Sequence, residues 1–288
     1  MERKLSSMEI FVGTSGYQFE DWFGTVYPES LRRKDVLEYY SHELGFNCVE
    51  LNYTYYRLPS FFTSRAIVKK VPEGFKFAVR SYREMTHDIW QDEERKKIKD
   101  TSDIFDLFIE GILPLKEEGK LGPVLLQFPY SFWPSEETLR YLEFCKEKLS
   151  DFDVVVEFRN RAWVKKDIFD FLKKFNLGYC IVDEPKIRGL HPLVPALTSK
   201  TGYIRLHGRN PRWFEAEKEE RYNYFYNEQE LREVLSKVKK VFEEAEKTYV
   251  FFNNCTGGSA LKNALMLKRI LGLLKDLNSA QKKALSMP

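Results

Sequence analysis

Residues 203–209 read YIRLHGR, which has the apolar pattern of a buried strand but also contains an arginine and a histidine. Side chains two positions apart in a strand point to the same side, so Arg205 and His207 share one face. A guanidinium group binds anions, and an imidazole transfers protons near neutral pH. The pair is therefore a candidate centre for chemistry, provided that other elements bring suitable groups beside it.

Similar polar residues mark the ends of the other expected strands. Glu50 and Asn52 share a face at one strand end, and Glu157 and Arg159 share a face at another. The remaining strand ends carry Thr14, Ser15, Arg80, Gln127, Asp183, Glu184, Asn253 and Asn254. The C-terminal mouth of a barrel of parallel strands would gather these side chains in one concave site.

The elements that must position these residues are short apolar runs alternating with amphipathic segments. Continuously apolar runs such as VVV at 154–156 are typical of parallel strands covered on both faces. The pattern predicts an α/β fold, a TIM (β/α)8 barrel, as a single domain over residues 1–288, with 1–8 as a candidate disordered extension. The expected strands are 10–14, 48–52, 76–80, 123–128, 154–159, 178–184, 203–208 and 249–254. The expected helices are 34–44, 102–116, 167–175, 229–247 and 263–274.

Two connections depart from this alternation. Residues 185–200 contain Pro185, Pro192 and Pro195, which leave little room for a helix and predict an irregular sixth connection. Residues 209–226 form a long aromatic and charged loop after the seventh strand. Long loops of this kind are often functional, and we expect this one to overhang the C-terminal face of the barrel.

Several motifs, in order along nearly the whole chain, carry a family resemblance. They are GTSGYQFEDWFGTVYP (13–28), VELNYTYYRLP (49–59), FKFAVR with MTH (75–87), LGPVLLQFP (121–129), VEFRNRAW (156–163), YIRLHGR (203–209) and YVFFNN (249–254). The chain resembles the YecE-like family of uncharacterised TIM-barrel proteins. It departs from the family pattern at Tyr17, Arg80 and Ala162, where Trp, Lys and Ser are usual, so a serine nucleophile is excluded at position 162. The resemblance implies the barrel and brings no established reaction with it.

The leading functional hypothesis is acid/base hydrolysis or lysis of a phosphate-bearing anionic substrate at the barrel mouth. His207 would act as acid or base, with Glu157 or Glu50 as its partner, because two carboxylates on well-separated strands suit such chemistry. Arginines would stabilise the developing negative charge. The candidate substrate-binding residues are Arg159, Arg205, Arg209, Asn52, Arg80, His87, Gln127, Trp163, Asn253 and Asn254.

Two alternatives use the same residues differently. Glu50, Glu157, Asp183 and His207 form a candidate ligand set for Mg²⁺ or Mn²⁺ in a metal-dependent phosphodiesterase or endonuclease acting on DNA, although neighbouring arginines would repel a cation. Alternatively, the glutamates and arginines form a neutralised ion-pair network that plugs the barrel, since buried charges must be paired.

Nucleic acid is a candidate large anionic partner. Cations and aromatic rings alternate in the loops at 186–188 and 209–225, and such mixtures track phosphates and stack on bases. Glu215, Glu217, Glu219 and Glu220 interrupt the same stretch, so a charged, solvated loop is the competing interpretation. A third class is a non-catalytic barrel that binds a small anion or an unidentified protein.

The composition sets outer bounds on these hypotheses. Hydrophobic residues make up 43% and charged residues 31% of the chain, which is typical of a globular domain with an ample core. A net charge of +3 is too small to require nucleic acid as the partner. The four cysteines have no metal-site or disulfide spacing, and no run is long enough to span a membrane. We expect a cytoplasmic protein, and its Lys- and Glu-rich surface suits a thermophile.

Overall fold

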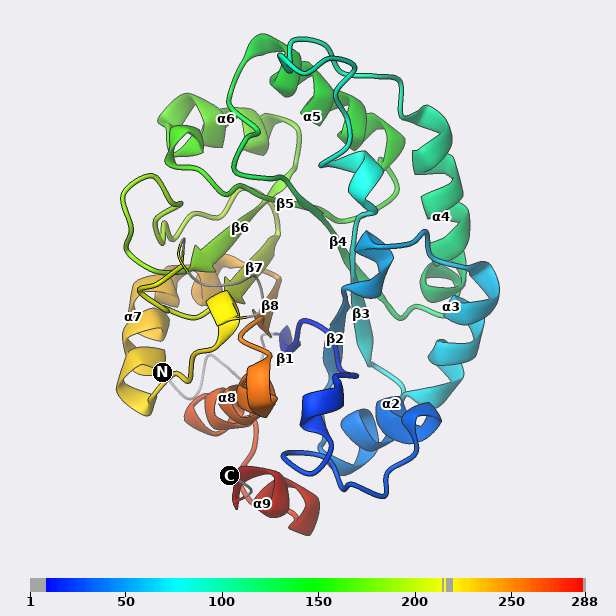
Figure 1. Cartoon of the computed structure of the whole chain (residues 1–288), viewed down its shortest axis with the longest axis vertical. Coiled ribbons are helices and arrows are strands. Elements are labelled where there is room, and N and C mark those ends of the chain that lie inside the picture. Colours follow the sequence, from blue (N-terminus) through cyan, green and yellow to red (C-terminus); the bar gives the residue numbers. More distant parts are fainter. Residues whose placement is uncertain (1–8, 214, 216–219, 287–288) are drawn as a thin grey trace.

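The computed structural model describes residues 9–213, 215 and 220–286, and its centre is an eight-stranded parallel sheet (Figure 1). The strands follow one another around the sheet in sequence order, with β1 beside β8. They are β1 (Glu9–Thr14), β2 (Cys48–Leu51), β3 (Lys76–Arg80), β4 (Leu121–Gln127), β5 (Val154–Glu157), β6 (Gly178–Asp183), β7 (Thr201–Leu206) and β8 (Lys247–Phe252). The predicted TIM barrel is confirmed.

The barrel closes between β1 and β2 at a single parallel bridge. Ser15 pairs with Glu50 there, and the backbone N–H of Gly16 donates to the carbonyl of Glu50 at 2.8 Å. Gly13 makes this approach possible, because a Cβ atom at that position would lie 2.3 Å from the carbonyl oxygen of Cys48. The closure brings β1 and β2 together directly below the polar strand ends.

Helices surround the barrel, as Figure 1 shows, and most of the expected ones are present within one to four residues of their predicted bounds. The segment expected as one helix at 34–44 is instead a 3₁₀ turn (Arg33–Asp35), a single α turn and a π turn (Tyr39–Glu43). Three helices were not predicted: α3, α5 and α9. The helices are α2 (Val36–Glu38), α3 (Phe61–Ile67), α4 (Ser102–Glu117), α5 (Glu136–Lys148), α6 (Lys166–Lys174), α7 (Glu228–Glu244), α8 (Ser259–Ile270) and α9 (Ser279–Ser286).

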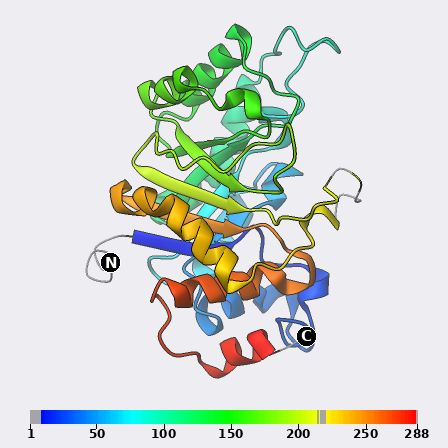
Figure 2. The ribbon, with the colours of Figure 1, turned by 90° about the vertical axis from the view of Figure 1, so that its left-hand side faces the viewer.

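The two irregular connections were predicted correctly. No helix lies between β6 and β7 in the structure, and the described part of the loop after β7 holds only the 3₁₀ turn Glu220–Tyr222. Figure 2 shows this loop projecting on the side opposite the start of β1, which is the C-terminal face of the barrel. The expectation for residues 1–8 lies outside the described residues.

Strand alternation divides the side chains into two sets. Residues such as Val12, Val49 and Val250 point outward and join the core between the sheet and the helices. Their neighbours point inward, where the lower half of the barrel is filled by a second apolar cluster: Phe11, Cys48, Ala78, Leu125, Val155, Cys180, Val182, Tyr203, Tyr249 and Phe251. Inward positions nearer the C-terminal ends are polar, and these build the site. No helix among the described residues has the length and apolarity needed to cross a membrane.

Candidate functional site

A layer of buried ion pairs lies directly above the apolar cluster, with Arg205 of β7 at its centre. Its guanidinium lies 2.7 Å from Glu50 Oε1 and 2.8 Å from Glu157 Oε2, so one arginine joins β2 and β5 across the barrel. Tyr203 Oη donates to Glu50 Oε2 at 2.7 Å, and Ser15 Oγ donates to Glu50 Oε1 at 2.8 Å. All five side chains are fully buried. We call this group the ion-pair layer.

Glu157 also contacts two residues on the upper side of the layer. Arg159 Nε lies 2.7 Å from Glu157 Oε1, and His207 Nε2 lies 3.2 Å from the same oxygen. Burial alone would raise the pKa of Glu157, but the charges of Arg159 and Arg205 outweigh it and hold this pKa well below its usual range. Glu157 is therefore a permanent anion.

His207 is a neutral imidazole in this arrangement. Burial and the nearby Arg159 charge lower its pKa to about 3. The amide of Asn253 lies 2.9 Å from His207 Nδ1 and donates to it, which places the ring proton on Nε2, beside Glu157. His207 is buried, and its two nitrogens face a carboxylate and an amide of the protein.

Glu184, at the end of β6, is the carboxyl group of the site that titrates near neutral pH. Burial raises its pKa to about 7, although the adjacent Arg159 acts in the opposite direction. Its Oε2 lies 3.3 Å from an Nη of Arg159, and its Oε1 accepts the backbone N–H of His191 at 3.0 Å. Arg159 is thus held between two carboxyl groups.

A cavity of about 870 Å³ opens above the ion-pair layer at the C-terminal ends of the strands. We call it the mouth cavity. Its walls come from the loops after most of the strands, which is the usual position of a TIM-barrel active site. It is lined by Ser15, Phe19, Glu20, Asp21, Asn52, Tyr55, Tyr56, Arg80, His87, Gln127, Tyr130, Arg159, Leu190, Trp213, Arg221, Tyr222, Asn253, Cys255 and Thr256.

Arg80, at the end of β3, is the cation of this cavity that lacks a carboxylate. It donates to Gln127 Oε1, and its guanidinium stacks on the ring of Tyr55 at 4.0 Å. Within the described ranges, no acidic side chain lies within ion-pair distance of Arg80, and its Nε has no hydrogen-bond partner. Burial, followed by the charge of Arg205, lowers the pKa of Arg80. This cation lacks a neutralising partner of its own.

His87, in the loop after β3, is the imidazole that faces the mouth cavity. Burial, and then the charges of Arg80 and Arg159, lower its pKa to about 3. Its Nδ1 lies 2.9 Å from Thr86 Oγ1, and its ring packs edge-to-face on Tyr55 at 4.8 Å. The imidazole is neutral until something offsets the nearby arginines.

The predicted site residues divide into those that line the cavity and those that do not. Asn52, Arg80, His87, Gln127, Arg159 and Asn253 line it. The predicted catalytic residues His207, Glu157 and Glu50 come together as expected, but they lie in and just above the ion-pair layer and none lines the cavity. Arg205 lies in the same layer, which matches the alternative prediction of an ion-pair network in the barrel.

Three predicted substrate-binding residues lie elsewhere. Arg209 points away from the cavity and binds Asp183 through Nε at 2.7 Å. Trp163 is packed in the core, with its ring stacked 4.1 Å from that of Phe158. Asn254 is buried and donates to Tyr224 O at 2.8 Å. These three side chains stabilise the walls of the site rather than facing its cavity.

The candidate metal ligands do not converge. Asp183 points outward, where Arg209 and Tyr226 occupy its carboxylate oxygens, with Tyr226 Oη donating at 2.7 Å. Glu50 and Glu157 are joined through Arg205 rather than through open coordination space. Among the residues described, no group of three or more His, Cys, Asp or Glu side chains is placed to hold a metal ion.

Glu184 was named from the sequence at a strand end but was not selected as a site residue, and the tyrosines that follow β2 were not selected either. Alternation along β6 could have identified Glu184, because Cys180, Val182 and Glu184 share the inward face whereas Asp183 does not. Tyr55 and Tyr222 belong to loops, whose side-chain directions have no such period. The position of Tyr222 agrees with the expectation that its loop overhangs the C-terminal face, whereas that of Tyr55 had no signal in the sequence.

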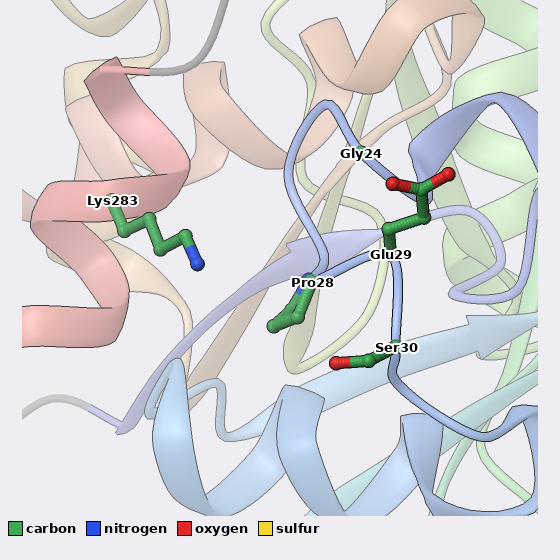
Figure 3. A pocket seen from close by; sticks show the side chains of 5 residues that line it. All are labelled: Gly24, Pro28, Glu29, Ser30 and Lys283. Carbon is green, nitrogen blue, oxygen red and sulfur yellow. The ribbon is translucent and has the colours of Figure 1, made fainter.

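A second hollow of about 600 Å³ lies on the outer surface, between the loop after β1 and α9 (Figure 3). Its lining is Gly24, Pro28, Glu29, Ser30 and Lys283, and Figure 3 shows Lys283 reaching from α9 toward Pro28. It holds one cation and one carboxylate on an exposed surface and has no buried polar group. Among the described residues, buried charged and polar side chains gather at the barrel mouth instead.

Comparison with known proteins supports the architecture over the whole chain. The family described as "Protein of unknown function DUF72" matches residues 11–285. The UPF0759 protein YunF of Bacillus subtilis (strain 168) is 31% identical, with 92% of this chain and 95% of that protein covered. A crystal structure of a DUF72 family protein (TM1631) from Thermotoga maritima MSB8 is 42% identical, with a TM-score of 0.84 and 92% and 99% of the chains covered. Another from Enterococcus faecalis V583 is 28% identical, with a TM-score of 0.78 and 93% and 98% covered.

Proposed function

The chain belongs to the DUF72 family, and from its site we propose that it is an acid/base enzyme that hydrolyses or lyses a small phosphate-bearing anion in the mouth cavity. The observation that carries the proposal is Arg80, a largely buried cation without a carboxylate partner among the described residues. A buried charge is costly unless paired, so the cavity favours an anion that supplies the missing partner.

The balance of charge around the cavity supports an anionic ligand. Three arginines, Arg80, Arg159 and Arg205, accompany three carboxyl groups, Glu50, Glu157 and Glu184. Burial raises the pKa of Glu184 to about 7, so near neutral pH this carboxyl offsets the arginine charges less than an ordinary glutamate would. Of the acidic rim residues, Glu20 is paired with Arg33, whereas Asp21 accepts only the backbone N–H of Gly257 at 2.7 Å and keeps its negative charge at the rim.

His87 is the group we assign to proton transfer, because it lines the cavity beside Arg80. Burial is the main cause of its low pKa and the charges of Arg80 and Arg159 come next, so an anion bound to these arginines offsets the second cause and raises this pKa. Substrate binding and protonation of His87 are therefore coupled. The protonated imidazole is then a general acid within the cavity.

For hydrolysis, a water oxygen forms the new bond to phosphorus while the bond from phosphorus to the leaving oxygen breaks. Protonated His87 gives its proton to that leaving oxygen, and the proton released by the attacking water restores the protonated imidazole. Arg80 and Arg159 stabilise the charge on the phosphoryl oxygens. The products are an alcohol and inorganic phosphate, so atoms and charge balance.

The buried residues have a positioning role in this proposal. Glu157 and Glu184 hold Arg159 in the cavity wall, and Asn253 and His207 connect that wall to the ion-pair layer. The hypothesis that His207 itself transfers protons stays a prediction. Full turnover by the His207→Ala variant would remove that role while leaving His87 as the acid.

Binding of inorganic phosphate, measured by isothermal titration calorimetry, tests the anion site. Replacing Arg80 by Gln removes a charged hydrogen-bond donor worth about 1.5–3 kcal/mol, so affinity should fall roughly 10- to 100-fold. Arg83→Gln is the matched control, because Arg83 is exposed, pairs with Asp88 and does not line the cavity. Equal phosphate affinities for the two variants would refute the anion site.

Release of inorganic phosphate from a panel of phosphorylated metabolites tests the reaction. His87→Gln should lower kcat by about 10²–10⁴-fold, as expected for loss of a general acid, while phosphate still binds. Arg80-dependent phosphate binding without any phosphate release would overturn the hydrolytic reaction and favour a non-catalytic anion-binding barrel.

A further inference from the structure

The mouth cavity is much larger than a phosphate group needs. Its volume of about 870 Å³ is in the upper part of the range of about 300–1,000 Å³ that holds small organic ligands. The surplus space is surrounded by rings: Phe19, Tyr55, Tyr56, Tyr130, Trp213 and Tyr222. The portion of the ligand beyond its anionic group therefore meets aromatic walls.

The aromatic walls stand on different sides of the mouth. Tyr55 and Tyr56 follow β2 and pack edge-to-face, with ring centroids 5.0 Å apart. Trp213 and Tyr222 follow β7 and pack edge-to-face at 5.2 Å. Around the closed barrel β1 and β8 lie between β2 and β7, so the two pairs are three strands apart on the rim. The two pairs line one cavity from its two sides.

The anion site adjoins the first of these walls. The guanidinium of Arg80 lies 4.0 Å from the ring centroid of Tyr55, and Tyr55 packs on His87 at 4.8 Å. Tyr222 approaches the inner polar groups from the other side, with its ring centroid 6.1 Å from that of His207. A ligand held at Arg80 thus places its remaining atoms between the two aromatic pairs.

Two amides of the cavity wall are already engaged within the protein. Gln127 binds Arg80 and the carbonyl of Phe128, and Asn253 binds His207. Asn52 Oδ1 is a buried acceptor without a hydrogen bond in the part of the chain described here. Beside aromatic walls, this acceptor suits a donor such as the exocyclic amine of a nucleobase.

We propose that the ligand of the mouth cavity is a nucleoside phosphate, with its phosphate at Arg80 and Arg159 and its base between the two aromatic pairs. This inference rests on the proposed function and specifies its substrate class. Aromatic rings stack on every nucleobase, so the aromatic walls bind nucleosides in general. Asn52 favours bases that carry an amino group. The nucleoside phosphate is either a free nucleotide or the phosphorylated end of a single strand.

Calorimetric titration of the protein with AMP, ribose 5-phosphate and inorganic phosphate tests the inference. AMP should bind at least about tenfold more tightly than ribose 5-phosphate, which has a comparable phosphate but no base. In Tyr222→Leu this advantage should fall about fivefold or more, while the affinity for inorganic phosphate stays the same. Phe225→Leu is the control, because Phe225 is an exposed aromatic of the same loop outside the cavity and should change nothing.

A 5′-phosphorylated single-stranded oligonucleotide identifies the source. Binding tighter than that of AMP, with the same dependence on Tyr222, supports the inference and identifies nucleic acid as the source; weaker binding identifies the free nucleotide. Equal affinity for AMP and ribose 5-phosphate, with both dependent on Arg80, overturns the nucleoside and leaves the anion site intact. Failure of all three titrants to bind overturns the nucleoside and the anion site together.

Discussion

Arg205 is fully buried and Arg80 is half-buried inside one barrel, and their surroundings differ. Arg205 lies between two carboxylates, at 2.7 Å from Glu50 and 2.8 Å from Glu157, and receives support from neighbouring hydroxyls. Arg80 lies nearer the cavity and contacts the amide of Gln127 and the ring of Tyr55. The charge of Arg205 is neutralised by carboxylates of the protein, whereas Arg80 has no carboxylate partner among the described residues.

This difference separates a structural charge from one available to a ligand. The partners of Arg205 come from strands across the barrel, so its charge joins the walls and is neutralised within the protein, although its Nε has no hydrogen-bond partner. The surroundings of Arg80 hold it without cancelling its charge, beside open volume. Residue type is the same in the two cases, whereas the partner set differs and Arg80 is less deeply buried than Arg205. Three experiments test this comparison.

The largest effect is expected from Arg205→Met. Removing the cation leaves Glu50 and Glu157 buried without their shared partner, which should lower the free energy of unfolding by about 3–5 kcal/mol. Denaturant unfolding measures it. Adding Glu50→Gln should restore part of the loss, because it removes one of the uncompensated charges. A loss below about 1 kcal/mol, the usual range of surface pairs, would contradict the structural role of the layer.

The next effect is a pH dependence caused by Glu184. Its pKa is about 7 in the folded chain and 4.5 ordinarily, so between these values the unfolded state releases this proton and the folded state retains it. Stability from this group is complete below pH 4.5 and is lost as the pH rises toward 7. The loss is on the order of 2–3 kcal/mol.

Comparison of wild type with Glu184→Gln isolates this contribution. The free energy of unfolding of Glu184→Gln, measured at pH 5 and pH 8, should not show the decrease that we attribute to Glu184. The comparison is needed because His207 acts in the opposite direction: its pKa of about 3 makes the folded state lose stability as the pH falls below 6.5. Parallel pH profiles for the two proteins would show that Glu184 titrates normally.

The smallest effect on stability is expected from Arg80→Met. The substitution removes a cation–π contact worth about 0.5–1 kcal/mol and the hydrogen bond to Gln127, but it also removes a partly desolvated charge that has no carboxylate partner among the described residues. These contributions oppose each other, so the free energy of unfolding should change by less than about 1 kcal/mol. A loss as large as that of Arg205→Met would show that Arg80 is structural as well.

Alternation and apolar runs allowed the architecture to be predicted. Strands such as 76–80 were located to the residue, and proline placement predicted the missing sixth helix. The same rule paired Glu157 with Arg159, and Arg205 with His207, on inward faces. It was not applied at the end of β6, where Asp183 was chosen as a candidate although Glu184 has the inward position. The expected thermophilic origin stays a prediction.

The sequence by itself determined the barrel, the family and the strand ends at which polar groups collect, because these depend on local periodicity and on the order of motifs. Only the tertiary structure decided which charges neutralise one another. Partners such as Arg205 and Glu50 are 155 positions apart in the chain. Their distance depends on how eight strands close into a barrel, and loop side chains such as Tyr55 and Tyr222 follow no period. The pairing that leaves Arg80 unmatched is a property of the closed barrel, so it is the three-dimensional arrangement that distinguishes the binding cation from the structural one.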